Sequence, residues 1–255
     1  YSDCRLYADD TLLCAKNVSP ADLQEDVTSL VVWSAKWGMS FNPTKCIHMQ
    51  LGKESAVNST HINNVPIPSS DHLKYLGVTI SSDMKWNTHI ANVTKKANRQ
   101  LGMLKRHLSD APAKTKLVAF NSIVRTTLEY ASQVWSPHAV GLIKQIDNVH
   151  RKAIRWIYRL PRICSITDCM SEHNISSLSD RRSDLDTKFL RRIEFGDYNI
   201  VLNQYIAYNS TYNTRNRTVD VHHRLNCSKF SFYNRMREQV KVIFPSDTNN
   251  PPTNN

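Results

Sequence analysis

The sequence predicts an α+β fold in which short strands come first and helices follow. As far as Ile80, apolar residues gather in strand-length runs bounded by polar residues, with one helical segment between them. From Trp86 onward, apolar residues recur at the spacing of amphipathic helices. At 255 residues the chain is long enough to bury a core and to form one or two domains.

The first predicted element is a β-hairpin with Asp9 and Asp10 at its turn. The apolar runs Leu6–Ala8 and Leu12–Ala15 flank the two aspartates, and each run has the length of a strand. Two carboxylates crowded at an exposed turn repel each other unless a cation lies between them, and Mg²⁺ prefers oxygen ligands. Because aspartate is also common in ordinary turns, a purely structural role stays open at this point.

A helix and a second strand are expected next. Ser19 is a suitable N-cap, Asp22 follows it by three residues, and Gly38 occupies the position of a C-terminal capping glycine. These signals predict a helix between Ser19 and Gly38. The stretch from Met39 to Leu51 is expected to be a strand interrupted by an Asn-Pro pair.

Two further segments complete the strand-rich part. Gly52–Asp71 is polar and lacks a clear period, so we expect a variable and mobile loop. Leu73–Ile80 alternates in the manner of a strand, and a turn is expected at Ser81–Asp83. Gly77 inside this strand indicates either a close approach of the backbone to another group or a β-bulge.

Four helices are predicted in the remainder of the chain. They run from about Trp86 to Leu104, Ala113 to Ser132, Leu142 to Arg159 and Leu178 to Phe195. The first and third carry basic residues beside their apolar stripes, and in the third these lie among Trp156 and Tyr158. Such residues can contact phosphates and stack on bases, although solvated bundle helices or a C-terminal charge bias would give a similar pattern. The basic residues expected to bind nucleic acid are Lys95, Lys96, Arg99, Lys105, Arg106, Arg151, Lys152, Arg155 and Arg159.

The net charge of +11 is spread unevenly along the chain. Residues 1–80 hold six Lys and Arg against eight Asp and Glu, whereas residues 81–255 hold 27 against 14. An acidic N-terminal part followed by a basic remainder is typical of a metal site next to a binding surface for a polyanion. A basic protein kept in solution by surface lysines would show similar totals, so charge alone does not decide between them.

The six cysteines show no paired framework, which favours reduced thiols and an intracellular location in the cytoplasm or nucleus. Cys164, Cys169 and His173 form a C-x4-C-x3-H pattern that fits no common zinc spacing, and a structural role is favoured. No apolar run reaches membrane-spanning length, and no signal peptide is recognised at the start. Because the chain begins at Tyr1 inside a strand pattern, we expect it to be part of a longer protein.

Three blocks of the sequence, taken in order, resemble the polymerases of non-LTR (LINE-type, jockey-like) retrotransposons. Tyr7-Ala8-Asp9-Asp10 resembles the Tyr-x-Asp-Asp box of reverse transcriptases. Segment 33–46 resembles the next block of the polymerase palm, and segments 74–80 and 86–90 resemble the block after that. The resemblance extends to about Lys241 and is firmest as far as the thumb.

This resemblance implies an RNA-directed DNA polymerase that uses two Mg²⁺ ions. Asp9 would be a direct metal ligand with Asp10 in support, and Lys45 would donate a proton to the departing pyrophosphate. The residues that hold the 3′ end of the primer, called the primer grip, would be Tyr75, Leu76 and Gly77. The implied partners are an RNA template, a DNA primer, their RNA–DNA hybrid and dNTP, with no membrane and no particular oligomeric state.

The resemblance also divides the chain into regions. Residues 1–83 would be the C-terminal part of a palm, 84–160 a helical thumb, 161–245 a basic and mainly helical C-terminal region, and 246–255 a disordered tail. A partner aspartate would lie upstream of Tyr1, so the 255 residues alone are expected not to polymerise. Two other interpretations stay open, namely a non-catalytic nucleic-acid-binding remnant of a retrotransposon and a helical interaction module.

Overall fold

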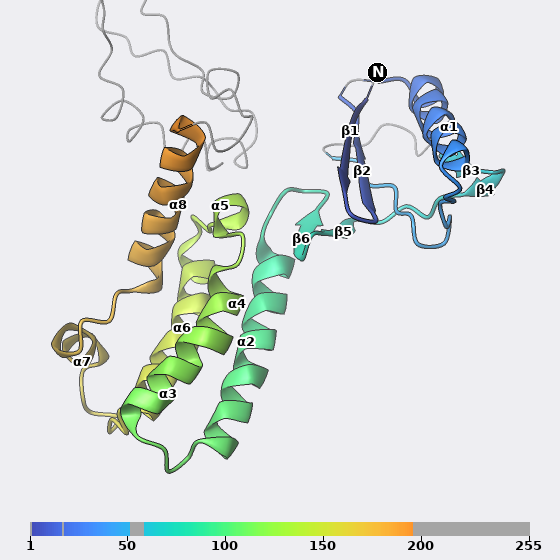
Figure 1. Ribbon diagram of the computed structural model, residues 1–255. Coiled ribbons are helices and arrows are strands. Elements are labelled where there is room, and N and C mark those ends of the chain that lie inside the picture. Colours follow the sequence, from blue (N-terminus) through green and yellow to red (C-terminus); the bar gives the residue numbers. More distant parts are fainter. Residues whose placement is uncertain (1, 17, 52–58, 196–255) are drawn as a thin grey trace, which may run out of the picture. The chain divides into compact units, whose positions relative to one another are not determined.

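The computed structural model describes residues 2–16, 18–51 and 59–195, and it confirms the α+β class (Figure 1). The chain divides into two compact units between His89 and Ile90. Among the described residues, the first unit contains three two-stranded antiparallel sheets and one complete helix, whereas the second is helical. The part of the predicted C-terminal region beyond residue 195, and the predicted tail, lie outside the described residues.

The first unit is built from short elements. They are β1 (Asp3–Tyr7), β2 (Asp10–Cys14), α1 (Pro20–Lys36), β3 (His61–Ile62), β4 (Val65–Pro66), β5 (His72–Tyr75) and β6 (Val78–Ser81). The pairs β1–β2, β3–β4 and β5–β6 are each antiparallel hairpins. The first of them confirms the predicted hairpin around the two aspartates.

Helix α1 begins and ends as its sequence predicts. Ser19 caps it by accepting a hydrogen bond from the backbone N–H of Asp22 at 3.2 Å. Gly38, with a φ of +67°, follows the last helical turn in the left-handed conformation that favours glycine. The hydroxyl of Ser2 donates a hydrogen bond to the Asp26 carboxylate, and this bond ties the start of the hairpin to α1.

The β3–β4 hairpin is joined to α1 by Gln24. Its side-chain amide donates to the carbonyl of His61 at 2.9 Å and accepts from the N–H of the same residue at 2.8 Å. The amide therefore pairs with the edge of β3 as the backbone of a neighbouring strand would. Asn63 and Asn64, with φ values of +49° and +63°, form a turn that selects asparagine or glycine. The prediction that Gly52–Asp71 is only a loop is therefore wrong at this hairpin.

The predicted strand from Met39 to Leu51 is also wrong. Those residues contain a single bridge, between His48 and Ser69, and no strand. Asn42 gives the physical reason, because its side chain accepts hydrogen bonds from the N–H and the hydroxyl of Thr44, at 3.0 and 2.8 Å. These bonds close a local turn in place of an extended chain.

The segment Leu73–Ile80 forms two strands, β5 and β6, where one was predicted. Leu76 and Gly77 reverse the chain in a two-residue turn, with φ values of +44° and +82°, and Tyr75 pairs with Val78. Because the alternation of apolar residues continues through this turn, the sequence pattern does not reveal it. Gly77 supplies a left-handed turn position, which accounts for the glycine without a bulge.

Helices make up the rest of the described chain. They are α2 (Asn87–His107), α3 (Ala113–Ala119), the π-helical segment η1 (Phe120–Arg125), α4 (Thr126–Glu129), α5 (Ser132–Trp135), α6 (Val140–Ile157), α7 (Ile166–Glu172) and α8 (Leu178–Glu194) (Figure 1). The four predicted helices are confirmed, the second of them as the run of α3, η1 and α4. That run ends at Glu129, because Tyr130 and Ala131 leave the helical conformation before α5 begins. None of the helices described is long and apolar enough to cross a membrane.

The helical unit packs around Trp135 and is tied together by Glu129. The indole N–H of Trp135, which is fully buried, donates to the carbonyl of Tyr130 at 2.7 Å. The carboxylate of Glu129 accepts two hydrogen bonds from Arg181 of α8, one of them at 2.9 Å, and lies 3.9 Å from the guanidinium of Arg125. One carboxylate between two guanidiniums therefore holds α4 to α8.

Candidate functional site

The two aspartates of the motif lie where the first hairpin reverses. Asp9 is in the two-residue turn, and Asp10 is the first residue of β2, paired with Tyr7. Both aspartates are exposed. Ala8, the other turn residue, has a φ of +53°, a conformation that costs a non-glycine residue about 1–2 kcal/mol. A strained turn thus presents two adjacent carboxylates to solvent.

This turn fits the ligand chemistry of Mg²⁺. The ion is commonly held by one or two carboxylates, with waters and substrate phosphates completing its octahedral shell. Within the described residues, no group of three or more His, Cys, Asp or Glu side chains is placed to hold a metal ion. Asp9 and Asp10 are therefore suited to a site that is completed by substrate or by further protein ligands.

Lys45 lies in the turn that Asn42 closes, and its backbone N–H donates to the carbonyl of Asn42 at 3.0 Å. Its side chain is exposed. No hydrogen bond or ion pair among the described residues joins Lys45 to Asp9 or Asp10. Its role as a proton donor stays a prediction.

The β5–β6 hairpin, which carries the predicted grip residues, is fixed by His89. The Nδ1 atom of this buried imidazole accepts a hydrogen bond from the backbone N–H of Thr79 at 3.1 Å, and Trp86 packs edge-on against the ring. Burial lowers the pKa of His89 to about 4, so the ring is neutral and can accept. His89 lies in the matching block 86–90, but no positioning role could be assigned to it from sequence.

The basic residues of α2 that are predicted to bind nucleic acid face solvent, and their binding stays a prediction. Lys95, Lys96, Arg99, Lys105 and Arg106 are all exposed, and the described residues offer none of them a hydrogen bond or ion pair. The opposite face of the helix is apolar and buried. The 21 residues of α2 include no Asp or Glu, so no carboxylate of the helix offsets the positive charge of its outer face. This face could contact a chain of phosphates.

The predicted nucleic-acid-binding residues of α6 and of the turn that follows it divide into two pairs. Arg151 and Lys152 are exposed. Arg155 donates to the carbonyls of Pro161 and Arg162, at 2.6 and 3.3 Å, and fixes the chain that follows the helix. Arg159 donates to the carbonyl of Ser109 at 3.4 Å and lies 3.9 Å from Asp110, although its side chain is 70% exposed. Arg155 and Arg159 therefore have structural contacts that the sequence pattern did not reveal.

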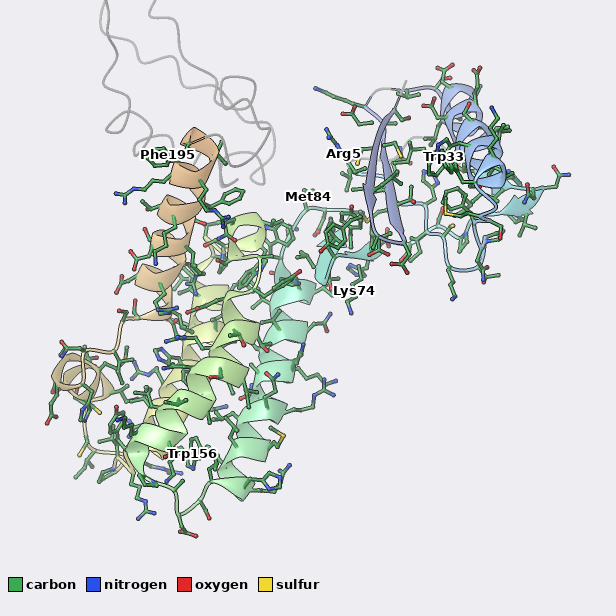
Figure 2. All side chains as sticks on the ribbon, in the orientation of Figure 1. Arg5, Trp33, Lys74, Met84, Trp156 and Phe195 are labelled. Carbon is green, nitrogen blue, oxygen red and sulfur yellow. The ribbon has the colours of Figure 1, made fainter. Side chains whose placement is uncertain are left out.

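The aromatic residues at the end of α6 also have partners within the protein. The ammonium group of the buried Lys116 lies 5.3 Å from the centre of the Trp156 ring (Figure 2). Tyr158 stacks on His173, with ring centroids 4.1 Å apart and planes 10° apart. The rings of Trp156 and Tyr158 therefore contribute to the packing of the helical unit.

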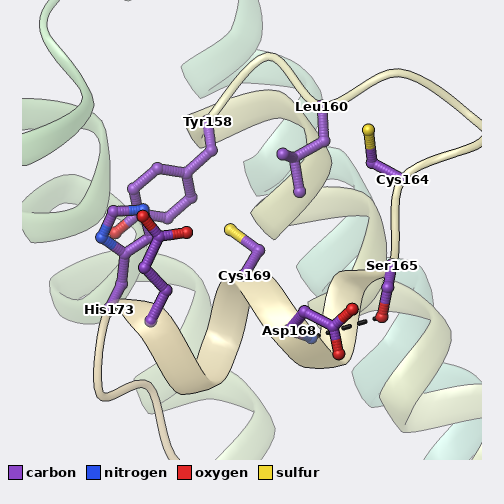
Figure 3. Close-up of a pocket in the computed structure, with 8 residues that line it drawn as sticks. Tyr158, Leu160, Cys164, Ser165, Asp168, Cys169 and His173 are labelled. Atoms are coloured by element: carbon purple, nitrogen blue, oxygen red, sulfur yellow. Dashed lines mark hydrogen bonds between the residues drawn. The ribbon is translucent and has the colours of Figure 1, made fainter.

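The cysteine and histidine residues singled out by spacing line a cavity of about 420 Å³ beside α7 (Figure 3). Cys164 precedes the helix, Cys169 is buried within it, and His173 follows its last turn. Burial raises the pKa of the Cys169 thiol, which disfavours the thiolate that metals bind. In the structure, Cys169 is buried and the imidazole of His173 stacks on Tyr158, so both residues have packing roles.

The chain was compared with known families and proteins. The reverse transcriptase (RNA-dependent DNA polymerase) family model matches residues 2–80, which run from β1 through α1 to Ile80 in β6. Across 197 residues, the chain is 24% identical to the RNA-directed DNA polymerase from mobile element jockey of Drosophila melanogaster. It is equally similar, over the same length, to the probable RNA-directed DNA polymerase from transposon BS of that organism. No solved structure matches the chain.

These alignments cover 73% of this chain but only 21% of the jockey protein and 22% of the BS protein. The chain thus spans about a fifth of the length of these curated relatives. A shorter alignment gives 31% identity over 113 residues to the putative 115 kDa protein in type-1 retrotransposable element R1DM, covering 42% of this chain and 11% of that protein. Residues 2–80 therefore match the reverse transcriptase family model, and the chain is similar to the polymerases of LINE-type, non-LTR retrotransposons.

Proposed function

We propose that the chain supplies the metal-binding turn, the primer grip and part of the nucleic-acid track of a retrotransposon RNA-directed DNA polymerase. The observation that carries this proposal is the exposed pair Asp9 and Asp10 at a hairpin turn, inside the segment matched to the reverse transcriptase family. In this proposal residues 1–83 are part of the palm, 84–160 the thumb and 161–245 a basic C-terminal region. The partners are an RNA template, a DNA primer, their hybrid and dNTP.

Each candidate residue has a defined task in nucleotide transfer. Asp9 and Asp10 hold Mg²⁺, with Asp9 as the direct ligand. Two bound Mg²⁺ ions would activate the 3′-hydroxyl of the primer and stabilise the leaving pyrophosphate. Lys45 donates a proton to that leaving group, whose oxygen departs more readily once protonated. The β5–β6 turn, at Leu76 and Gly77, positions the 3′ end of the primer.

Leu76→Asn is expected to stabilise the β5–β6 hairpin and yet slow primer extension. Leucine at a φ of +44° is strained, whereas asparagine tolerates this conformation, so stability should rise by about 0.5–1 kcal/mol. If the leucine side chain contacts the primer, extension should fall at the same time. Thermal unfolding of the chain measures the first effect. Primer extension by a polypeptide extended upstream of Tyr1 measures the second, because residues 1–255 alone are expected not to polymerise.

The control for this substitution is Asn63→Leu, the reverse change in the β3–β4 turn at a φ of +49°. It should lower stability by a similar amount and leave extension unchanged. A Leu76→Asn protein that gains stability and extends primers at the normal rate would remove Leu76 from the primer grip.

Nucleic-acid binding by the full chain is expected to weaken steeply with salt. Each neutralised phosphate adds about 0.9 to the slope of log affinity against log salt concentration. Replacing Lys95, Arg99 and Arg106 with alanine should therefore lower the slope by up to about 3. Fluorescence anisotropy with a labelled RNA–DNA hybrid at several salt concentrations gives the slope.

A variant with equal charge loss provides the control. Lys144, Lys188 and Arg191 are exposed cations on α6 and α8, and their replacement with alanine removes the same net charge. This variant should keep the slope of the unmodified chain. Equal losses in both variants would indicate non-specific attraction to a basic surface, and a flat response to salt in the unmodified chain would favour an interaction module.

A further inference from the structure

The β5–β6 hairpin, which carries the proposed primer grip, is a sheet of only two strands. A two-stranded hairpin is marginally stable by itself, and in an antiparallel pair every second residue directs its N–H away from the partner strand. The N–H of Thr79 is directed in this way, because it donates to a side chain outside the hairpin. A group from elsewhere in the chain therefore completes the outer edge of β6 at this residue.

That group is the imidazole of His89, in the first turn of α2, and this turn belongs to the same compact unit as the hairpin. Its Nδ1 atom accepts the hydrogen bond from Thr79 at 3.1 Å, and the residue is only 2% exposed. The ring of Trp86 packs edge-on against the imidazole, with centroids 6.2 Å apart and planes at 76°. Burial lowers the pKa of His89 to about 4, so the ring stays neutral at neutral pH and can accept.

The hydrogen bond lies close to the turn of the hairpin. Thr79 is the second residue after Gly77, so the anchored amide is roughly 7 Å along the strand from the turn, at about 3.3 Å per residue. The turn itself is strained, because Leu76 has a φ of +44°. A strained turn keeps its conformation where the surrounding contacts hold it, and the bond to His89 is one such contact.

We propose that His89 is a positioning residue for nucleotide transfer, which anchors Thr79 to the first turn of α2 and so holds the Leu76–Gly77 turn where the 3′ end of the primer binds. His89 acts through the grip and touches neither the primer nor the metal ions. Catalysis is sensitive to such support, because a misplacement of about 1 Å can lower the rate about a hundredfold. The inference rests on the proposed function, since it names what supports the proposed grip.

The test uses two substitutions that separate the acceptor from the ring, in a polypeptide extended upstream of Tyr1. His89→Asn places a carbonyl oxygen the same number of bonds from Cα as Nδ1, so it can accept from Thr79 and should keep kcat within about threefold. His89→Phe keeps a ring and loses the acceptor, so kcat for primer extension should fall about tenfold or more. The KM for the primer–template should stay unchanged in both variants. Single-turnover extension well below Tm counts the active sites and corrects for unfolded protein.

A third variant and a control keep the test independent of folding. His89→Gln places the acceptor one bond further from Cα and displaces β6, so this variant should fold and lower kcat by about threefold to tenfold. The control is His72→Phe, at the open end of the same hairpin, where the Nδ1 atom of His72 lies 3.1 Å from the hydroxyl of Ser81. This variant loses that contact far from the turn and should leave kcat unchanged.

The outcomes distinguish this inference from the proposed function. If His89→Phe or His89→Gln folds and extends primers at the normal kcat per active site, the grip does not depend on this bond and only this inference is wrong. If His89→Asn loses as much as His89→Phe, the ring matters and the acceptor does not, which also overturns the inference. Equal losses in His72→Phe and His89→Phe would show that any loosening of the hairpin suffices. If the unmodified extended polypeptide does not extend a primer, the proposed function fails, and this inference fails with it.

Discussion

Replacement of Asp9 with alanine is expected to abolish primer extension, with a rate loss of at least about a thousandfold, and to leave template binding nearly unchanged. A catalytic metal ion contributes several kcal/mol to the transition state, and each 1.36 kcal/mol is a tenfold change in rate. Asp9 occupies the exposed turn of the β1–β2 hairpin, so its loss removes a proposed ligand without opening a core. Affinity for nucleic acid would come from Lys and Arg side chains, which the substitution does not change.

The measurement is extension of a DNA primer on an RNA template with Mg²⁺, using a polypeptide in which the reading frame is extended upstream of Tyr1. Asp3→Ala is the control, because Asp3 is an exposed aspartate in the same hairpin and lies outside the Tyr-x-Asp-Asp box. If extension survives Asp9→Ala, or if the variant fails to fold, Asp9 and Asp10 have only a structural role in the turn.

Residues 1–255 alone should not extend the primer. If they incorporate nucleotides measurably, and if Asp9→Asn abolishes this incorporation, no upstream carboxylate is needed and the expectation is wrong.

Acidification from pH 7 to pH 5 is expected to cost the helical unit about 2 kcal/mol through His150 alone. This imidazole is 4% exposed and stacks on Phe120, with ring centroids 5.6 Å apart. Burial lowers the pKa of His150 to about 4, from 6.5 in the unfolded chain, and the nearby guanidiniums of Arg125 and Arg181 act in the same direction while Glu129 opposes them. Between these two pKa values the unfolded chain binds more protons, so stability is lost as the pH falls through that window.

The pH dependence of thermal unfolding, followed by circular dichroism, checks this expectation. His150→Phe keeps an aromatic ring against Phe120 and cannot take up a proton, so this variant should lose about 2 kcal/mol of the pH dependence. His107→Phe, at an exposed position in the last turn of α2, should keep the dependence of the unmodified chain. An unchanged pH response in His150→Phe would show that His150 is not the group that titrates.

Local signals predicted the elements whose ends are marked by single residues. The cap Ser19, the glycine at position 38 and the two apolar runs around Asp9 and Asp10 each act within a few residues of the chain, so the first hairpin and α1 could be derived from sequence. The β3–β4 hairpin was missed although Asn63-Asn64 is a turn signal of the same local kind. The β5–β6 turn was harder, because leucine is an unusual residue at a positive φ.

Contacts between distant segments set the limit of the sequence prediction. Arg155 and Arg159 look like nucleic-acid ligands in a helix-by-helix analysis, and their hydrogen bonds to carbonyls of Pro161 and Ser109 depend on how the chain folds back. The same holds for His89, whose acceptor role at the backbone N–H of Thr79 exists only when β6 lies beside the start of α2. The motif residues were predictable, and the residues that position them were not.

The π-helical turn at Phe120–Arg125 can be regarded as one extra residue accommodated inside a helix instead of in a loop. Deleting one residue there would remove the extra residue and restore a regular α-helix, with Glu129 still on the side that faces Arg181. Deleting a residue in the regular α-helix before it, within α3, would instead rotate everything after the deletion by about 100°, the angle between successive residues. Glu129 would then face away from Arg181, and α8 would lose its charged anchor. A deletion should therefore be better tolerated at Phe120–Arg125 than in α3.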